Sequence, residues 1–229
     1  MIPVSISEEV AAVCPDLHLC VLSCDVANTE SDARLWEEIS RAEEELRASG
    51  RLEDINKWSP IRATRQAYKR FGKDPNRYRP SSEALHRRIL RGLPLYRIDT
   101  LVDSINLISI RTGYSIGGFD RDKIQGDLVL GVGREGELYR GIGRGELNIA
   151  GLPVYRDAFG GIGTPTSDEE RTKIDQDTQH LLMIINAYSG PVGLQEAAAY
   201  GSDLLKRYVS ATNLEAALIS VKNRTVLML

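Results

Sequence analysis

The hydrophobic period of this chain changes near residue 114, and that change limits the folds open to it more than any other feature. Upstream, apolar residues recur at helical spacing in four segments that begin near residues 31, 59, 81 and 100. Downstream, short runs of strand type are separated by glycine and acidic residues, as in a meander. Helices that precede a group of strands indicate an α+β fold rather than a doubly wound sheet.

Start and stop signals support the helices. Polar caps or proline stand at the starts, and glycine stands just after the ends. The predicted helices, with their caps, are 31–50 (Ser31 or Asp32), 59–72 (Ser59, then Pro60), 81–92 (Ser81 or Ser82), 100–113 and 193–209.

The predicted strands are short except for one apolar run. They cover residues 17–26, 127–133, 136–142, 145–151 and 152–158, the continuous apolar run 180–189, and a tail within 214–229. No linker of low complexity divides the 229 residues, so we expect a single domain over 1–229. In it, helices over 60–71, 81–91 and 100–112 pack on a sheet drawn mainly from residues 126–187.

Three early cysteines, Cys14, Cys20 and Cys24, raise the question of a metal site. Their spacing fits no common zinc motif, even with His18 among them, and an odd count argues against a disulfide scaffold. Because Cys20 and Cys24 alternate with apolar residues, buried strand cysteines are the favoured interpretation. No metal and no cofactor are expected. Without an apolar run of membrane-spanning length or a signal-peptide pattern, we expect no membrane association and a cytoplasmic location.

Positive charge is concentrated between Arg62 and Arg97. This segment carries eleven Lys and Arg against two acidic residues, a balance of +9, and the remainder, with 18 basic and 30 acidic residues, carries −12. A basic segment on an acidic body suits a polyanion such as RNA, since phosphate contacts are largely electrostatic. Solvated helix faces paired with acidic neighbours fit the same charge pattern.

The stretch RPSSEALHRRILRG, residues 79–92, concentrates this charge on one predicted helix. Its apolar stripe leaves Arg87 and Arg88 free to point elsewhere, where they could hold phosphates. His86 lies between Leu85 and these arginines, and a surface histidine without chemistry is favoured over a general base.

The order of motifs resembles a known family. The segment that runs from SSEALHRRILRG through IDTLVDSINLISIRTG to GGFDRDKIQGDLVL resembles the module formed by the third and fourth domains of the β subunit of bacterial phenylalanyl-tRNA synthetase, and more closely its free-standing relatives. The matching positions of its helix and its F-D-x-D-x-I-x-G segment are Ile98, Asp99, Val102, Asp103, Asn106, Phe119, Asp120, Asp122, Ile124 and Gly126. The free-standing relatives share the upstream AYKRFGKDPNRYRPSSEAL. The resemblance covers residues 60–187, with the N-terminal strand and helix and the C-terminal helix as additions.

The resemblance implies a three-layer α+β domain of the editing-module type. In the synthetase that module binds the acylated end of tRNA and hydrolyses tyrosine wrongly attached to it. Gly117 stands where the synthetase has a pocket histidine, a loss that free-standing relatives share. Counting back from Asp177-Thr178 aligns Glu170 with the synthetase's pocket glutamate, with Thr172 beside it. On this basis Glu170→Gln should slow deacylation roughly tenfold to a hundredfold.

Candidate site residues follow from these observations. A positioned water can cleave an activated ester without a catalytic triad, so Glu170, Asp103 and Asn106 are the catalytic candidates, although Asp103 and Asn106 also suit backbone ties. The binding candidates are Ser81, His86, Arg87, Arg88, Gly117, Asp120 and Thr172. Three functions fit: hydrolysis of mischarged aminoacyl-tRNA in trans, binding of an amino acid or a tRNA acceptor end without cleavage, and protein interaction on the same scaffold. The oligomeric state is not predicted.

Overall fold

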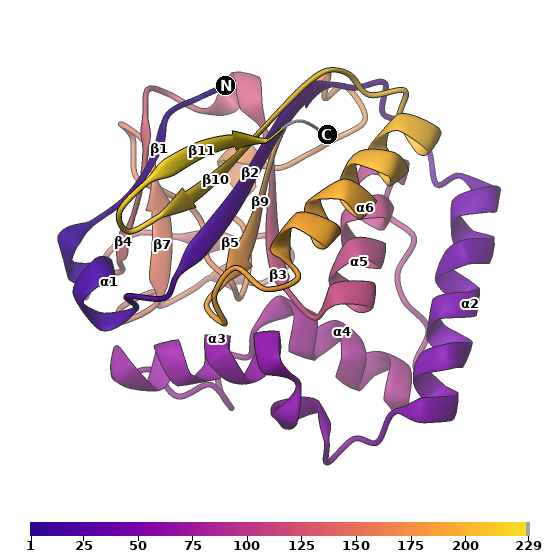
Figure 1. Ribbon diagram of the computed structural model, residues 1–229, viewed down its shortest axis with the longest axis horizontal. Helices are drawn as coiled ribbons and strands as arrows, with labels where there is room; N and C mark the ends of the chain where they lie inside the picture. Colours follow the sequence, from indigo (N-terminus) through magenta and orange to yellow (C-terminus); the bar gives the residue numbers. More distant parts are fainter. Residues whose placement is uncertain (228–229) are drawn as a thin grey trace.

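The computed structural model describes residues 1–227 (Figure 1). The predicted helices are all present, and a helix at residues 8–13 and strands at residues 4–6, 115–120 and 161–163 are additional to those predicted. The helices are α1 (Glu8–Val13), α2 (Ala33–Ser49), α3 (Ser59–Arg70), α4 (Ser81–Leu90), α5 (Thr100–Thr112) and α6 (Leu194–Tyr208), with short 3-10 turns η1 (Ile55–Lys57), η2 (Arg121–Lys123) and η3 (Glu170–Thr172). The strands are β1 (Val4–Ile6), β2 (His18–Asp25), β3 (Ser115–Asp120), β4 (Leu128–Val132), β5 (Arg140–Gly141), β6 (Gly145–Glu146), β7 (Pro153–Arg156), β8 (Gly161–Gly163), β9 (His180–Ala187), β10 (Thr212–Ser220) and β11 (Arg224–Leu227).

Two main sheets and one small hairpin contain these strands. The larger sheet has the order β11-β10-β2-β9-β3, and all its neighbours are antiparallel. The smaller sheet has the order β1-β4-β7-β8, in which β1 runs parallel to β4. β5 and β6 form a separate two-stranded pair.

The core lies on both faces of the larger sheet, and β9 shows why. Leu181, Met183 and Ile185 pack against the helices α2, α5 and α6, whereas Leu182 and Ile184 pack against the smaller sheet. A strand covered on both faces has no solvent side, so it is apolar throughout instead of alternating. The result is three layers of helices, larger sheet and smaller sheet, with α3 and α4 along one end (Figure 1). The predicted three-layer α+β fold is confirmed.

The predicted source of the sheet was wrong. Only β9 of the larger sheet lies within residues 126–187, because β2, β3, β10 and β11 are its other members. β2 pairs with β9 from His18↔Ala187 to Asp25↔His180, a contact between chain segments about 160 residues apart. Hydrophobic period identifies a strand but carries no information about which distant strand pairs with it.

The helix caps agree with the sequence at α2 and differ at α3 and α4. The Asp32 carboxylate accepts hydrogen bonds from Arg34 N at 2.7 Å and Leu35 N at 3.2 Å, as a cap does. At α3 and α4, however, Trp58 and Pro80 occupy the cap positions and no side chain caps the helix. The Ser82 hydroxyl instead lies 3.1 Å from that of Ser115 on β3, so it ties the helix to the sheet.

Cys14, Cys20 and Cys24 are free and buried, as predicted, although only Cys20 and Cys24 lie on a strand and Cys14 follows α1. Burial raises the pKa of the Cys20 thiol to about 12. Within residues 1–227, no three His, Cys, Asp or Glu side chains are grouped so that they could hold a metal ion. None of the helices in the same range combines the length and the apolar character needed to cross a bilayer.

Candidate functional site

A cavity of about 260 Å³ opens between α4, α5, β3 and the segment 164–174, and we call it the α4–α5 cavity. Its apolar walls come from Leu85, Ile98, Val102, Ile105, Ile116, Ile142 and Ile174. Its polar groups come from Ser81, Asn106, Ser109, Thr164, Ser167, Asp168 and Lys173. Apolar walls with a few convergent polar groups are typical of a small-molecule site, and this volume suits an amino acid.

Asp168 supplies the carboxylate of the α4–α5 cavity. Its Oδ2 accepts a hydrogen bond from Gly118 N at 3.2 Å. Burial raises the pKa of Asp168 to about 8, and the Gly118 N–H only partly opposes the shift. The residue is half-buried and is one of those that line the cavity. A carboxyl group that titrates near neutral pH in a cavity is a candidate general base.

Glycines on two strands let the backbone approach this carboxylate. A Cβ added at Gly163 would lie 2.9 Å from Oδ1 of Asp168 and 2.5 Å from Cζ of Phe119. A Cβ added at Gly117, on β3, would lie 3.5 Å from the same oxygen. The sequence offered no comparable signal for Asp168, which is the first of three consecutive acids in SDEER.

Asn106 is the sequence-predicted catalytic candidate that the structure brings into the α4–α5 cavity. The residue is half-buried on α5, and its amide has no hydrogen-bond partner among residues 1–227. Asp103, one turn earlier, is buried elsewhere. Its carboxylate accepts from Trp36 Nε1 at 2.7 Å, Ser31 Oγ at 2.6 Å and Ile98 N at 3.2 Å. Asp103 therefore ties α2 to the start of α5, whereas Asn106 faces an open site.

Glu170 lies outside the α4–α5 cavity, on η3. Its carboxylate accepts from Lys173 Nζ at 2.8 Å and Gly143 N at 3.4 Å. These two contacts, that to Lys173 first, hold the pKa of Glu170 below its usual value. Lys173 does line the cavity, so Glu170 reaches the site only through that ammonium group.

Of the predicted binding residues Ser81, Thr172 and Asp120, one lines the α4–α5 cavity and two are buried outside it. Ser81 lines the α4–α5 cavity at the start of α4. Thr172 is fully buried, and its hydroxyl has no partner in the described part of the chain. Asp120 is also buried, where it accepts from Thr178 Oγ1 at 3.1 Å and pairs with Lys123. Of these three, only Ser81 reaches the cavity.

His86 is buried, so the interpretation as a surface histidine was wrong. Its Nδ1 lies 2.6 Å from Ser82 O, and its Nε2 lies 3.0 Å from Ile110 O. Burial lowers the pKa of His86, although the two carbonyl oxygens favour the protonated ring. Trp58 packs edge-on against it, with ring centroids 4.8 Å apart. The imidazole thus links α4 to α5 and does not contact the cavity.

The arginines of α4 point towards protein partners. The buried carboxylate of Glu83 accepts from Arg65 Nη1 at 2.8 Å and Arg87 Nε at 2.7 Å. Arg87 also donates to Asn56 Oδ1 at 2.9 Å. Arg88 donates to Pro94 O at 2.6 Å, and its guanidinium lies 4.1 Å from the ring centroid of Tyr96. Much of the predicted positive face is therefore engaged inside the protein.

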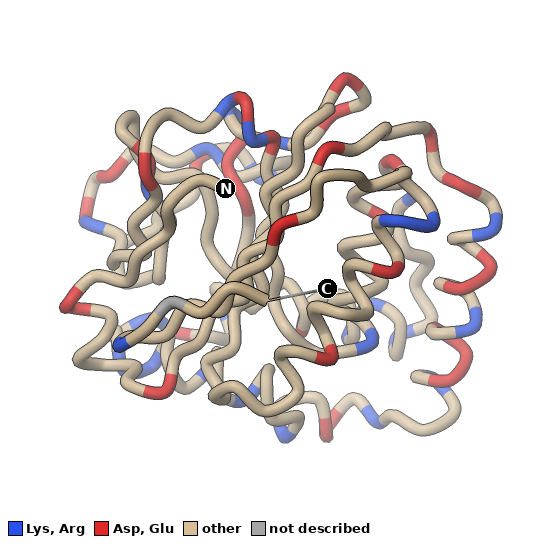
Figure 2. Tube along the Cα trace, turned by 45° about the horizontal axis from the view of Figure 1, so that its top comes forward, with Lys and Arg blue, Asp and Glu red and all other residues tan. Residues whose placement is uncertain are grey.

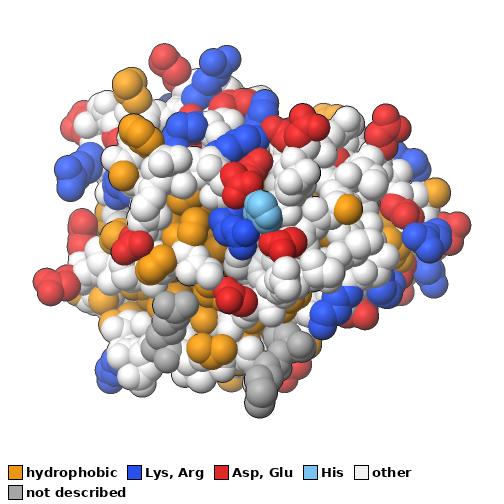
Figure 3. All heavy atoms as spheres, turned by 90° about the horizontal axis from the view of Figure 1, so that it is seen from above, with side chains coloured by type: hydrophobic (Ala, Val, Ile, Leu, Met, Phe, Trp, Pro, Cys, Tyr) orange, Lys and Arg blue, Asp and Glu red, His pale blue; other side chains and the backbone are white. Residues whose placement is uncertain are grey.

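Charges elsewhere are interspersed. Along α2, at the right of Figure 2, single arginines are interspersed with runs of two or three glutamates. The face seen from above, away from α3 and α4, carries acidic and basic side chains side by side (Figure 3). Neither region offers the single-sign surface that a polyanion needs.

Gly117 is not among the residues that line the α4–α5 cavity, although a Cβ there would lie 3.5 Å from Oδ1 of Asp168. A Cβ there would lie 2.7 Å from Cζ of Phe119, whose ring covers the position. We expect Gly117→Ala to lower the free energy of unfolding by about 1–3 kcal/mol, since a close-packed ring must move. Urea unfolding measures this change. The control is Gly131→Ala, where the nearest atom is the end of the Arg156 side chain, so the loss in free energy of unfolding should be smaller. Equal losses for the two variants would contradict the prediction.

A model of the B3/4 domain family matches residues 63–225. Among solved structures, an N-terminal fragment of the phenylalanyl-tRNA synthetase β-subunit from Pyrococcus horikoshii is similar, with a TM-score of 0.51 and 13% identity. The alignment covers 99% of this chain and 54% of that one, so this chain spans about half its length. At this identity the likeness shows the fold. The curated proteins contain no match.

Proposed function

The chain belongs to the B3/4 domain family, and from that premise we propose that it hydrolyses aminoacyl-tRNA in trans, with the aminoacyl group in the α4–α5 cavity. One observation carries the proposal: a carboxylate with a pKa near 8 shares an apolar cavity with an unpartnered amide. The resemblance to a synthetase β-subunit supports tRNA as the carrier. β2 and β10 lie in the same sheet as β9, which supports the proposal that the chain acts as one domain.

The chemistry uses water as the nucleophile. The Asp168 carboxylate accepts a proton as water attacks the ester carbonyl, and the tetrahedral oxyanion accepts hydrogen bonds from the Asn106 amide or the Lys173 ammonium. The bond from carbonyl carbon to ribose oxygen then breaks. Asp168 returns its proton to the ribose oxygen, which leaves a free amino acid and uncharged tRNA. A general base works best when its pKa lies near the working pH, and the pKa of Asp168, about 8, lies near neutral pH.

The size and the walls of the cavity restrict the substrate. A volume of about 260 Å³ accepts an amino-acid side chain but not a nucleoside in addition, so the terminal ribose must remain at the mouth. Because isoleucine, leucine and valine side chains form most of the wall, we expect apolar or small side chains to be preferred.

The test is deacylation of a panel of tRNAs that carry correct and incorrect amino acids. We expect the protein to accelerate loss of at least one apolar or small aminoacyl group by about a hundredfold or more over buffer. Aminoacyl groups with ionised side chains, attached to the same tRNA, serve as the control. If the protein binds an aminoacyl-tRNA tightly without accelerating its hydrolysis, the chain is a binding module instead. If neither aminoacylated nor free tRNA binds at any salt concentration, both the hydrolase and the binding-module functions are excluded, and protein interaction on this scaffold is the remaining function.

A further inference from the structure

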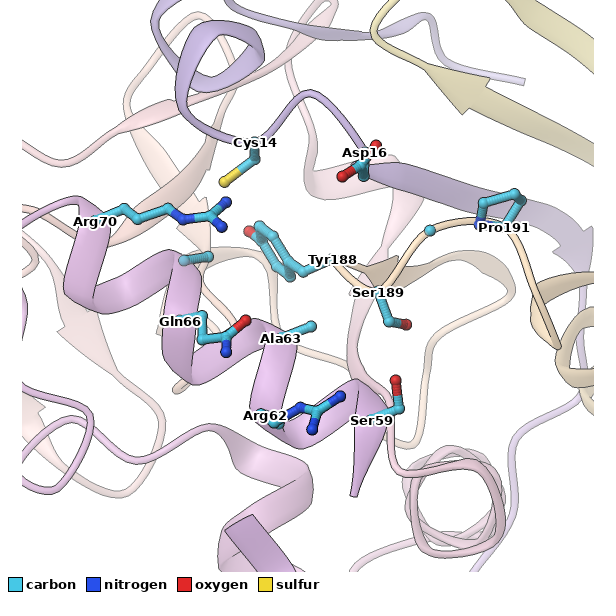
Figure 4. A pocket seen from close by; sticks show the side chains of 12 residues that line it. Cys14, Asp16, Ser59, Arg62, Ala63, Gln66, Arg70, Tyr188, Ser189 and Pro191 are labelled. Atoms are coloured by element: carbon cyan, nitrogen blue, oxygen red, sulfur yellow. The ribbon is translucent and has the colours of Figure 1, made fainter. Parts of the chain in front are cut away.

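A second pocket, separate from the α4–α5 cavity, lies between α3 and the loops that follow α1 and β9 (Figure 4). Its volume is about 370 Å³, and we call it the Arg62–Arg70 pocket. The residues that matter to its chemistry are Cys14, Asp16, Arg62, Gln66, Arg70 and Tyr188. Burial raises the pKa of the Cys14 thiol, so this sulfur stays protonated and is a poor nucleophile.

One face of α3 supplies the positive charge. Arg62, Gln66 and Arg70 recur every four residues, which places them in one row along the helix. Within residues 1–227 the Arg62 guanidinium has no hydrogen-bond or ion-pair partner, and Arg70 donates only to Val13 O at 3.2 Å. Arg65, which lies outside this row, is bound to Glu83. α3 therefore presents two largely free guanidinium groups to the pocket.

Tyr188 is a second, independent sign of a ligand. The residue is 8% exposed, and its hydroxyl has no hydrogen-bond partner in the part of the chain that the structure describes. Figure 4 shows this hydroxyl directed towards Cys14 and Arg70. A buried hydroxyl without a partner costs free energy that a bound oxygen atom would recover. Burial also keeps the pKa of Tyr188 well above its usual value, so the group remains a neutral donor.

We propose that the Arg62–Arg70 pocket binds a phosphate group of RNA. The two guanidinium groups, the Gln66 amide and the Tyr188 hydroxyl are donors that suit phosphate oxygens. Asp16 is the acidic residue of the lining. Its carboxylate opposes a free, multiply charged anion but can accept a hydrogen bond from a ribose 2′-hydroxyl, and this favours RNA over inorganic phosphate. The proposal rests on the proposed function for the identity of the RNA as tRNA.

A neighbouring pocket supports a nucleotide over an isolated anion. This larger pocket, about 740 Å³, shares Ser59 and Ser189 with the Arg62–Arg70 pocket. Tyr200, Pro60 and Val192 supply apolar surface to it. Unpaired bases are commonly bound on aromatic and apolar side chains. A phosphate held at the Arg62 end of the pocket, about one helical turn from Ser59, would lie beside this larger pocket, where the adjoining nucleoside could enter.

The experiment compares binding of uncharged tRNA to three variants over a range of salt concentrations. Arg62→Gln combined with Arg70→Gln should weaken binding about tenfold or more and lower the log-log salt slope by about 0.7–0.9, the value for one phosphate contact. The control, Arg34→Gln combined with Arg41→Gln on α2, removes the same charge and should leave the slope unchanged. Tyr188→Phe should weaken binding about threefold to tenfold without lowering the melting temperature, because its hydroxyl has no partner to lose.

Each outcome decides between the two proposals. If the wild-type protein binds and deacylates tRNA but the Arg62 and Arg70 variant does so equally well, the pocket assignment fails and the proposed function stands. If both double variants lose the same affinity and slope, the effect is one of net charge and the pocket is not the site. If inorganic phosphate raises the wild-type melting temperature through Arg62 and Arg70 while RNA binding is unaffected, the pocket takes a small anion and the RNA proposal is overturned. Absence of tRNA binding by the wild-type protein overturns both.

Discussion

Asp168→Asn is expected to slow deacylation by at least about a hundredfold while the protein melts no earlier than the wild type. General bases typically contribute a factor of about 10² to 10⁴ to a rate. The asparagine side chain keeps the volume and can still accept the hydrogen bond from Gly118 N. Single-turnover deacylation at saturating protein measures the rate, and calorimetry measures the melting temperature.

The pH dependence of the deacylation rate and of the protein's stability follows from the raised pKa of Asp168. Its folded-state pKa, about 8, lies above its ordinary value of 3.8, so the folded protein holds the proton more tightly than the unfolded chain. The contribution of Asp168 to the free energy of unfolding therefore falls as the pH rises from about 4 to about 8, and it does not change further above pH 8. Asp168→Asn should match the wild type near pH 4 and exceed it in stability above pH 8. The wild-type rate should rise about tenfold per pH unit up to about pH 8 and then level off.

Glu170→Gln is the matched comparison for Asp168→Asn, since it neutralises a carboxylate two residues away that lies outside the cavity. The tenfold to hundredfold effect predicted for Glu170 from the sequence stays a prediction, and the same assay tests it. Because Glu170 reaches the cavity only through Lys173, we expect a smaller loss than for Asp168. A rate for Asp168→Asn that equals the wild-type rate on a cleaved substrate would remove Asp168 from the mechanism.

Glu83→Gln is expected to lower the free energy of unfolding by about 3–5 kcal/mol. Glu83 is fully buried and pairs with Arg65 at 2.8 Å and with Arg87 at 2.7 Å. Removing one member of a buried ion-pair network leaves its partners charged and uncompensated, which costs far more than the network contributes when intact. Urea unfolding at pH 7 measures the loss.

The control for Glu83 is Glu45→Gln, which removes the partner of Arg111 at the surface. Exposed pairs contribute at most about 1 kcal/mol, so this variant should unfold nearly as the wild type does. Equal losses in the free energy of unfolding for Glu83→Gln and Glu45→Gln would contradict the prediction that burial makes removal of Glu83 costly. The network also bears on the hypothesis that Arg87 and Arg88 are free to hold RNA phosphates. We expect Arg87→Ala to lower the melting temperature, because it removes one of the cations paired with Glu83.

The sequence was sufficient for most elements and for their class. Asp32 and Gly50 mark the ends of α2 correctly, and the apolar run at residues 180–189 becomes the strand β9. Cys20 and Cys24 fall on one buried face of β2, as their spacing predicts. These features are local: capping, period and turn chemistry depend on neighbours within a few residues, so they can be read along the chain.

The same sequence left the roles of its charged residues open, because those depend on distant partners. Arg62, Arg65 and Arg87 belong to one basic segment, yet Arg65 and Arg87 meet Glu83 while Arg62 faces a pocket. His86 follows the pattern of a surface helix residue and is buried because α5 and Trp58 cover it. A charge pattern does not show which side of a helix the rest of the fold will cover.

The sequence by itself determined the α+β class, the longer helices, most of the strands and the resemblance to the synthetase module, since each of these is written in local period and motif order, but it did not predict β1, α1, β3 or β8. Only the tertiary structure decided where the candidate site lies. Asp168 is one of three consecutive acids, and its pKa rises because β3 and β8, brought together through β9 and the smaller sheet, surround its carboxylate with protein. Desolvation is a property of the assembled surroundings, and the chain acquires it only when segments far apart in sequence pack together.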